Sequence, residues 1–264
     1  MRVAIFCGGL GTRLRDYSVE IPKPLVPLGS LPILWHVMKY YAFYGHTDFV
    51  LCLGYKAEVI RNYFIDRAQR QPDGGKVAGD AQSVRLSVDG DEWRVTFVDT
   101  GLAANVGQRL KAVEPHFRDQ PVFLANYADG LTDFRLPMIV EEFKARDALG
   151  IFLSVRPNCS FHFVRCDSDG RVVSVDDVVK ANARINGGYF VFSNEIFRYI
   201  RPGEELVEQP FERLIDEGRL FAMDYDGFWR CVDTFKDLQA LENLLSGGEA
   251  PWMVWRNQLA ASGA

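Results

Sequence analysis

The chain has 264 residues, of which 48% are hydrophobic and 25% charged, a composition typical of a globular protein and unlike that of a disordered chain. With 30 Lys and Arg against 35 Asp and Glu, its net charge of −5 argues against nucleic-acid or anionic-membrane partners bound through bulk positive charge. No apolar run approaches the roughly 18 residues that a membrane span needs. Five scattered cysteines without a Cys-x-x-Cys pair fit reduced thiols and a cytoplasmic location.

The first two-thirds of the sequence alternate β-rich apolar runs with helical patterns. In chain order, these patterns predict a strand at 2–7, a helix at 32–45, a strand at 48–53 followed by a helix, a hairpin over 84–98, a helix around 106–113, a strand at 121–125, a helix at 136–144 and a strand at 149–155. Repeated β-α-β units with continuous apolar strands predict an α/β fold. We expect a mostly parallel, Rossmann-like sheet with helices on both faces.

After Pro157 the pattern changes. A second hairpin is predicted over 161–175, then a strand at 187–192 and two helices at 210–217 and 236–245. No linker rich in Pro, Gly or Ser and no internal repeat interrupts the chain. We therefore expect one domain over 1–264, with a small β-sheet or hairpin region added to the main sheet.

The most informative segment is GGLGTRL at 8–14, directly after the first predicted strand. Glycines at such a position let backbone N–H groups approach an anion, and Arg13 and Lys23 add two cations that can neutralise a triphosphate. A P-loop is excluded because no lysine follows Gly11, and a Rossmann fingerprint is excluded because position 14 is leucine. The simpler interpretation of this segment is a tight turn with a surface arginine. The presence of both Arg13 and Lys23 disfavours that interpretation.

This segment resembles the N-terminal signature of the sugar-1-phosphate nucleotidyltransferases. The similarity continues in IPKPLVPLG at 21–29, VDTG at 98–101, GQRLK at 107–111, YADG at 127–130, INGGYF at 185–190, VDT at 232–234 and APW at 250–252. The Trp35-His36 pair, the VDTG segment and the APW ending favour the branch of glucose-1-phosphate cytidylyltransferases. The resemblance implies a nucleotide-binding half at about 1–130, an acceptor-binding half at about 131–235 and a C-terminal helix and tail at 236–264.

Members of this family let a phosphate oxygen of the acceptor attack the α-phosphorus of a nucleoside triphosphate and displace pyrophosphate. The resemblance assigns Arg13, Lys23 and Asp129 to catalysis, and Asp129 with Asp233 to Mg²⁺, which prefers hard oxygen ligands. By the same resemblance, the nucleotide-binding residues are Gly8, Gly9, Gly11, Thr12, Arg13, Lys23, Thr100, Gly101 and Arg109.

Several of these residues also have a purely structural interpretation. An aspartate before glycine, as at Asp129, is typical of turns, and Asp233 is placed to cap the last predicted helix. Thr100, Gly101 and Arg109 fit the end of a buried strand equally well.

Three further features are better explained by packing than by chemistry. Trp35 and His36 lie in an amphipathic helical pattern, and His162 between two phenylalanines suggests a half-buried structural histidine. The apolar segment 252–255 fits either a core plug or an interface anchor. Relatives of this kind are commonly oligomeric, and a homo-oligomer is left open.

The acceptor side departs from the family pattern. The usual Glu-Lys-Pro segment is replaced by SVDDVVK at 174–180, so Lys180 or one of two arginines, Arg156 and Arg184, must supply the charge for an acceptor phosphate. The resemblance assigns acceptor binding to Asp177, Lys180, Asn186, Gly187 and Gly188.

The sequence thus predicts Mg²⁺-dependent transfer from CTP to a sugar 1-phosphate, glucose 1-phosphate above all, giving a CDP-sugar and pyrophosphate. One alternative is an enzyme that uses UTP or dTTP, and another is one that acts on a different phosphorylated or phosphonate acceptor. A third, of another class, is a catalytically silent nucleotide-binding regulatory subunit.

Overall fold

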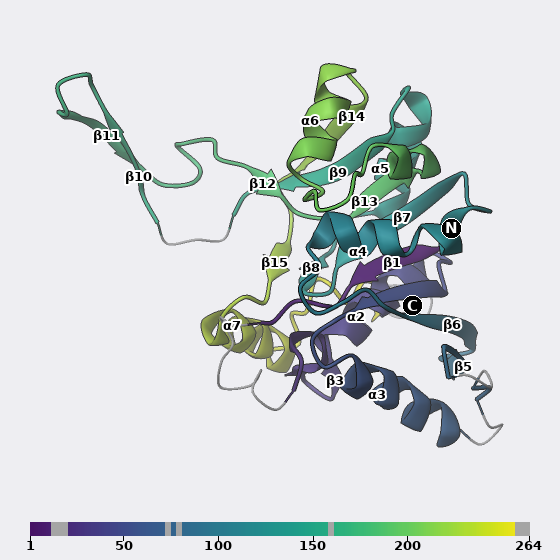
Figure 1. Ribbon diagram of the computed structural model, residues 1–264. Helices are drawn as coiled ribbons and strands as arrows, with labels where there is room; N and C mark the ends of the chain where they lie inside the picture. The colour runs from purple at the N-terminus through teal and green to yellow at the C-terminus, as the bar shows by residue number, and fades with distance from the viewer. Residues whose placement is uncertain (12–20, 72–74, 78–80, 158–160, 257–264) are drawn as a thin grey trace.

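The computed structural model describes residues 1–11, 21–71, 75–77, 81–157 and 161–256. Its central sheet has the strand order β12-β9-β13-β7-β1-β4-β6-β5, with β14 paired to β9 (Figure 1). The strands are β1 (Val3–Phe6), β4 (Asp48–Leu53), β5 (Ser83–Val88), β6 (Asp91–Asp99), β7 (Val122–Tyr127), β9 (Gly150–Val155), β12 (Ile185–Asn186), β13 (Phe190–Ser193) and β14 (Leu220–Tyr225).

The middle of the sheet is parallel and its two sides are mixed. Strands β7, β1, β4 and β6 run parallel to one another, and β14 runs parallel to β9. Antiparallel pairing occurs between β5 and β6 and where β12 and β13 meet their neighbours. The predicted α/β fold is therefore confirmed.

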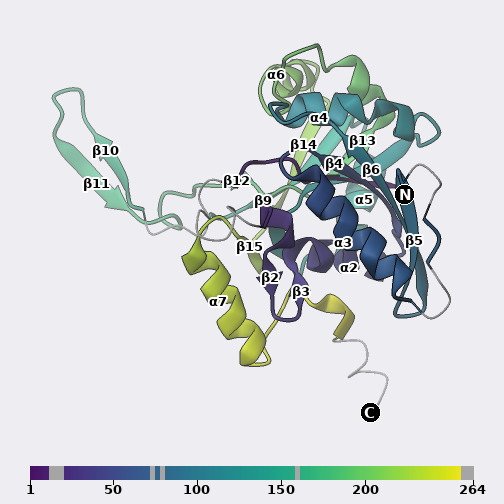
Figure 2. The ribbon, with the colours of Figure 1, turned by 60° about the horizontal axis from the view of Figure 1, so that its bottom comes forward.

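Helices cover both faces of the sheet, as expected. They are α2 (Ile33–Phe43), α3 (Ala57–Gln69), α4 (Val106–Ala112), α5 (Leu136–Ala145), α6 (Gln209–Asp216) and α7 (Phe235–Ser246). Alternate residues of β1 point to opposite faces, so Val3 and Ile5 join the core under α2 and α3, whereas Ala4 and Phe6 join the core under α4 and α6. Figure 2 shows these two layers on either side of the sheet.

Three short two-stranded sheets are added to this frame. They are formed by β2 (Pro27–Leu28) with β3 (Leu31–Pro32), β8 (Gly130–Thr132) with β15 (Trp229–Cys231), and β10 (Phe163–Cys166) with β11 (Val172–Asp176). The last is the predicted second hairpin, and it projects far from the body of the molecule (Figure 1). His162, at its base, is exposed, so the expectation of a half-buried histidine is wrong: most residues of β10 and β11 are exposed as well.

The C-terminal segment closes one face of the core. Trp252 is 1% exposed and donates a hydrogen bond from Nε1 to Nδ1 of His36, at 3.3 Å. The Nε2 atom of His36 lies 3.0 Å from the carbonyl oxygen of Leu28. Packing therefore accounts for Trp35 and His36, both 2% exposed, and Trp252 with Met253 forms a core plug. Within the described ranges, no helix is both long and apolar enough to span a membrane.

Candidate active site

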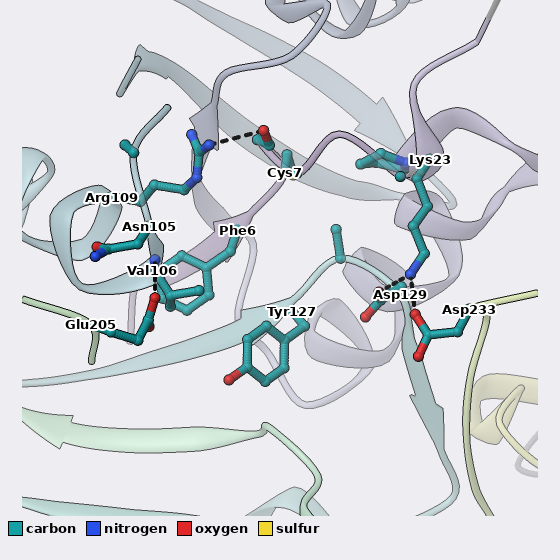
Figure 3. A pocket seen from close by; sticks show the side chains of 16 residues that line it. Phe6, Cys7, Lys23, Asn105, Val106, Arg109, Tyr127, Asp129, Glu205 and Asp233 are labelled. Atoms are coloured by element: carbon teal, nitrogen blue, oxygen red, sulfur yellow. Dashed lines mark hydrogen bonds and ion pairs between the residues drawn. The ribbon is translucent and has the colours of Figure 1, made fainter. Parts of the chain in front are cut away.

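A cavity of about 380 Å³ lies at the carboxyl ends of β1 and β7. Its lining comes from residues 6–9 and Gly11 at the end of β1 and just after it, from residues 127–129 at the end of β7, and from residues 104–106 with Arg109 around the start of α4. Lys23, Pro24, Glu205 and Asp233 complete it from distant parts of the chain (Figure 3). Ligands of open α/β sheets generally bind in the crevice outside the carboxyl ends of the strands. The volume is that of a small-molecule site.

Two aspartates face this cavity because β8 pairs with β15. In that pair Gly130 lies opposite Cys231, and the amide of Val232 donates to the carbonyl oxygen of Asp129 at 3.1 Å. Asp129 directly precedes β8, and Asp233 follows β15 after one residue, Val232. Their carboxylates lie close enough for Nζ of Lys23 to contact an oxygen of each. Two segments far apart in sequence thus place two carboxylates at one end of the cavity.

Asp233 is not the cap of α7. That role belongs to Thr234, whose side chain accepts from the amide of Asp237, while Asp237 accepts from the amide of Thr234 in a reciprocal capping box. Asp233 instead lines the cavity.

Lys23 joins the two carboxylates. It begins the 3-10 helix η2 (Lys23–Leu25), and its Nζ lies 2.5 Å from Oδ2 of Asp129 and 2.8 Å from Oδ1 of Asp233 (Figure 3). Burial disfavours the charged ammonium, but the two carboxylates outweigh this effect and raise the pKa of Lys23. The lysine is therefore held as a cation between the aspartates.

Arg109 is buried at the opposite end of the cavity. Its side chain donates to the carbonyl oxygens of Leu53, Gly8 and Gly101 at 2.9 to 3.0 Å, and to Oγ1 of Thr100 at 2.7 Å. These contacts tie the glycine segment after β1 to the ends of β4 and β6. Among the described residues no carboxylate forms a salt bridge with this guanidinium, which thus supplies positive charge to the cavity wall.

The predicted nucleotide-binding residues therefore separate into two groups. Gly8, Gly9, Gly11, Lys23 and Arg109 line the cavity. Thr100 and Gly101 lie behind it and hold Arg109 in place. The two remaining residues of the motif, Thr12 and Arg13, lie outside the described residues.

The predicted acceptor residues also separate. Asn186 approaches the cavity, because its Nδ2 lies 3.5 Å from the hydroxyl of Tyr127, which lines it. Gly188 donates its amide to Oδ1 of Asn186, and Gly187 accepts from the indole of Trp229 at 2.9 Å. These contacts place the segment 186–188 beside the aspartate end.

Asp177 and Lys180 do not line this cavity. They lie between β11 and β12, where the amide of Lys180 donates to the carboxylate of Asp177 in a local turn. The two arginines considered for the acceptor phosphate are Arg156 and Arg184. Both donate to the same carboxylate oxygen of Asp226, at 2.9 and 2.8 Å.

Among the lining residues that sequence analysis did not predict are three with polar side chains, Asn105, Tyr127 and Glu205. Asn105 caps α4 through its side chain, and Glu205 accepts from the amide of Val106 at the start of the same helix. Burial, together with the charge of Glu205, raises the pKa of Tyr127 to about 12. The Asn-Val-Gly-Gln run carried a capping-box signal for Asn105, whereas Glu205 lies in a polar loop that carried none.

The charges suit a metal-loaded polyphosphate. The described lining contains two cations, Lys23 and Arg109, and three carboxylates, Asp129, Asp233 and Glu205. No cluster of three or more metal-ligating side chains occurs in the described part of the chain. Two carboxylates without further protein ligands fit Mg²⁺, which commonly takes one or two carboxylates and completes its shell with substrate phosphates and water.

Fold and site together define an α/β protein with a glycine-lined cavity and a carboxylate pair at the carboxyl ends of its parallel strands. Residues 3–246 match the family model described as nucleotidyl transferase, and the chain belongs to this family. It is a nucleotidyltransferase similar to glucose-1-phosphate cytidylyltransferases.

Two curated relatives match nearly the whole chain. The glucose-1-phosphate cytidylyltransferase of Salmonella typhi is 36% identical over 260 residues, which cover 97% of this chain and 100% of the relative. The probable glucose-1-phosphate cytidylyltransferase of Bacillus subtilis is 31% identical over 257 residues, with the same coverage. Among solved structures, a putative glucose-1-phosphate thymidylyltransferase from Bacillus anthracis superposes with a TM-score of 0.67 at 18% identity, covering 92% of this chain and 94% of that one. This likeness supports the fold.

Proposed function

We propose that the protein transfers a cytidylyl group from CTP to a sugar 1-phosphate, glucose 1-phosphate above all, and releases pyrophosphate with the help of Mg²⁺. The observation that carries the proposal is the convergence of Lys23, Asp129 and Asp233 on the cavity that the glycine segment also lines. The similarity to glucose-1-phosphate cytidylyltransferases along nearly the whole chain supports the choice of CTP.

In the proposed reaction the protein positions two anionic reactants and offsets their charge. Gly8, Gly9 and Gly11 line the cavity and carry no side chain that would block a phosphate, and Lys23 has the charge and reach to bind the phosphates that leave. Asp129 and Asp233 would hold Mg²⁺, which polarises the α-phosphorus and neutralises phosphate charge when bound. A phosphate oxygen of the acceptor then attacks in line, and the bond to pyrophosphate breaks.

The acceptor enters, in this proposal, beside the segment 186–188. A phosphate monoester needs a cation to offset its desolvation. Arg156 and Arg184 are already paired with Asp226, whereas the exposed ammonium of Lys180 forms no ion pair within the described residues. We therefore assign the acceptor phosphate to Lys180. Because Lys180 lies outside the cavity lining, this assignment requires the turn between β11 and β12 to approach the cavity when the acceptor binds. A different phosphorylated or phosphonate acceptor remains the alternative, because the Glu-Lys-Pro segment is replaced.

The test is an assay of pyrophosphate release with CTP, UTP or dTTP, each with glucose 1-phosphate and Mg²⁺, followed by the mass of the product. We expect release with CTP and a product with the mass of CDP-glucose. Faster release with UTP or dTTP would overturn the base assignment. CTP binding by calorimetry without turnover on any acceptor in a panel of sugar phosphates would favour the silent regulatory subunit, which the presence of both aspartates argues against.

A further inference from the structure

We propose that Lys23 is a built-in competitor of the metal, so that a divalent cation binds the aspartate pair only together with the nucleoside triphosphate. This inference rests on the proposed use of Asp129 and Asp233 as metal ligands. It adds a rule for the order in which the site is filled.

The ammonium lies between two carboxylate oxygens that a metal shared by the aspartates could also use. Nζ is within hydrogen-bond distance of one oxygen from each aspartate, at 2.5 and 2.8 Å. Mg²⁺ binds carboxylate oxygens at about 2.0 to 2.1 Å. A metal that used both of these oxygens would therefore overlap the ammonium or repel it strongly, and the two cations exclude each other from the shared position.

The lysine is well placed for this role. Its side chain is only 15% exposed, against 26% for Asp129 and 35% for Asp233, so the contacts form in a partly desolvated setting where charge pairs are strong. Without a cation between them, the two carboxylates would repel each other. Lys23 relieves that repulsion and keeps the pair assembled.

A triphosphate gives the ammonium a second position. Lys23 lines the same cavity as the glycine segment, and its flexible four-carbon stem can move Nζ from the aspartates to phosphate oxygens inside that cavity. The same phosphates bring additional oxygen ligands for the metal. Metal and nucleotide therefore favour each other's binding, and linkage makes that coupling equal in both directions.

Mn²⁺ serves as the probe, and its binding to the full-length protein is followed by electron paramagnetic resonance with and without a non-hydrolysable CTP analogue. The variants are Lys23→Met, which removes the charge, and Lys23→Arg, which keeps it. Lys236→Met is the matched control, since Lys236 is exposed on α7 and lies three residues from Asp233. Near-ultraviolet circular dichroism identifies any variant that fails to fold, and Lys23→Gln then replaces Lys23→Met.

We expect Lys23→Met to bind Mn²⁺ alone about tenfold or more tightly than the unmodified protein, and to lose most of the coupling between Mn²⁺ and the analogue. Lys23→Arg and Lys236→Met should bind Mn²⁺ alone as weakly as the unmodified protein. The double variant Lys23→Met with Asp129→Asn should lose the gain, because the gain depends on the aspartate pair.

Equal or weaker Mn²⁺ binding by Lys23→Met would overturn the inference. This readout needs no turnover, so its failure is distinguishable from failure of the proposed function. If Lys23→Met binds Mn²⁺ more tightly but the unmodified protein releases no pyrophosphate, the inference stands and the proposed reaction is rejected. If the unmodified protein releases pyrophosphate but Lys23→Met binds Mn²⁺ no more tightly, the reaction stands and the inference is rejected.

Discussion

A Cβ atom on Gly8 would lie 1.9 Å from Nη1 of Arg109. The buried guanidinium therefore leaves no room for a side chain at position 8, a reason for glycine that is separate from the predicted role in phosphate binding. Gly54 meets the same group, with a Cβ placed 2.5 Å from Nη1. Arg109 occupies the space that these two glycines leave and fixes the strand ends around the cavity.

Substitution of Gly8 by alanine should therefore displace Arg109 and destabilise the protein. We expect a loss of about 1 to 3 kcal/mol in the free energy of unfolding, as for other insertions into packed sites, measured by urea denaturation. Gly9→Ala is the control, because a Cβ at Gly9 meets no atom within 4 Å. Equal stability of the two variants would contradict this account.

Neutralising one of the two aspartates should abolish most of the activity. Asp129→Asn removes a charge that offsets Lys23 and, by our proposal, a metal ligand, so we expect pyrophosphate release to fall roughly 100-fold or more. Asp216→Asn, on the exposed end of α6, should leave the rate unchanged. The idea is refuted if Asp129→Asn keeps the rate of the unmodified enzyme while Mg²⁺ is present.

Stability should fall as the pH drops below about 6.5. Burial lowers the pKa of His36 in the folded protein, and its Nδ1 accepts from Trp252, a bond that needs the neutral ring. Below the unfolded pKa the unfolded chain binds the proton more readily, so the folded state loses relative stability until the pH passes the folded pKa. His46, whose pKa burial lowers to about 4, acts in the same direction.

Urea denaturation of the unmodified protein and of His36→Gln between pH 7.5 and 5 checks this expectation. The variant should show a flatter dependence of stability on pH, because it lacks one of the three histidines, His36, His46 and His116, whose pKa is lowered in the folded protein. If the free energy of unfolding of the two proteins changes equally with pH, His36 does not contribute to the pH dependence.

The acceptor assignment is tested by Lys180→Ala. If Lys180 binds the acceptor phosphate, its loss should raise the KM for glucose 1-phosphate roughly 10- to 100-fold, since a charge-assisted contact is worth roughly 1.5 to 3 kcal/mol. The affinity for CTP, measured by calorimetry, should stay the same. An unchanged KM would contradict this role of Lys180 and leave Arg156 or Arg184 as the residue that binds the acceptor phosphate.

Local sequence patterns predicted most of the elements but not the edge strand β14. Residues 220–225 are only partly buried, because this strand pairs with β9 alone, and their hydrophobic signal is correspondingly weak. The short β8 and β15 strands were also missed, although their pairing positions both aspartates. Such pairing joins distant segments and leaves no local signature.

The resemblance placed Asp177 and Lys180 at the acceptor site, yet the structure places them in a turn between β11 and β12, away from the cavity lining. Motif position specifies a place along the chain. Which residues surround Asp177 and Lys180 depends instead on the direction in which the β10-β11 hairpin projects from the central sheet.

By itself the sequence determined the α/β class and the nucleotidyl transferase family, because hydrophobic periodicity, glycine and proline positions and motif spacing all act over short stretches of chain. Only the tertiary structure decided that Lys23 bridges Asp129 and Asp233, and that Arg109 fills the space beside Gly8. These contacts depend on strand order and register, which are settled when distant segments pack together.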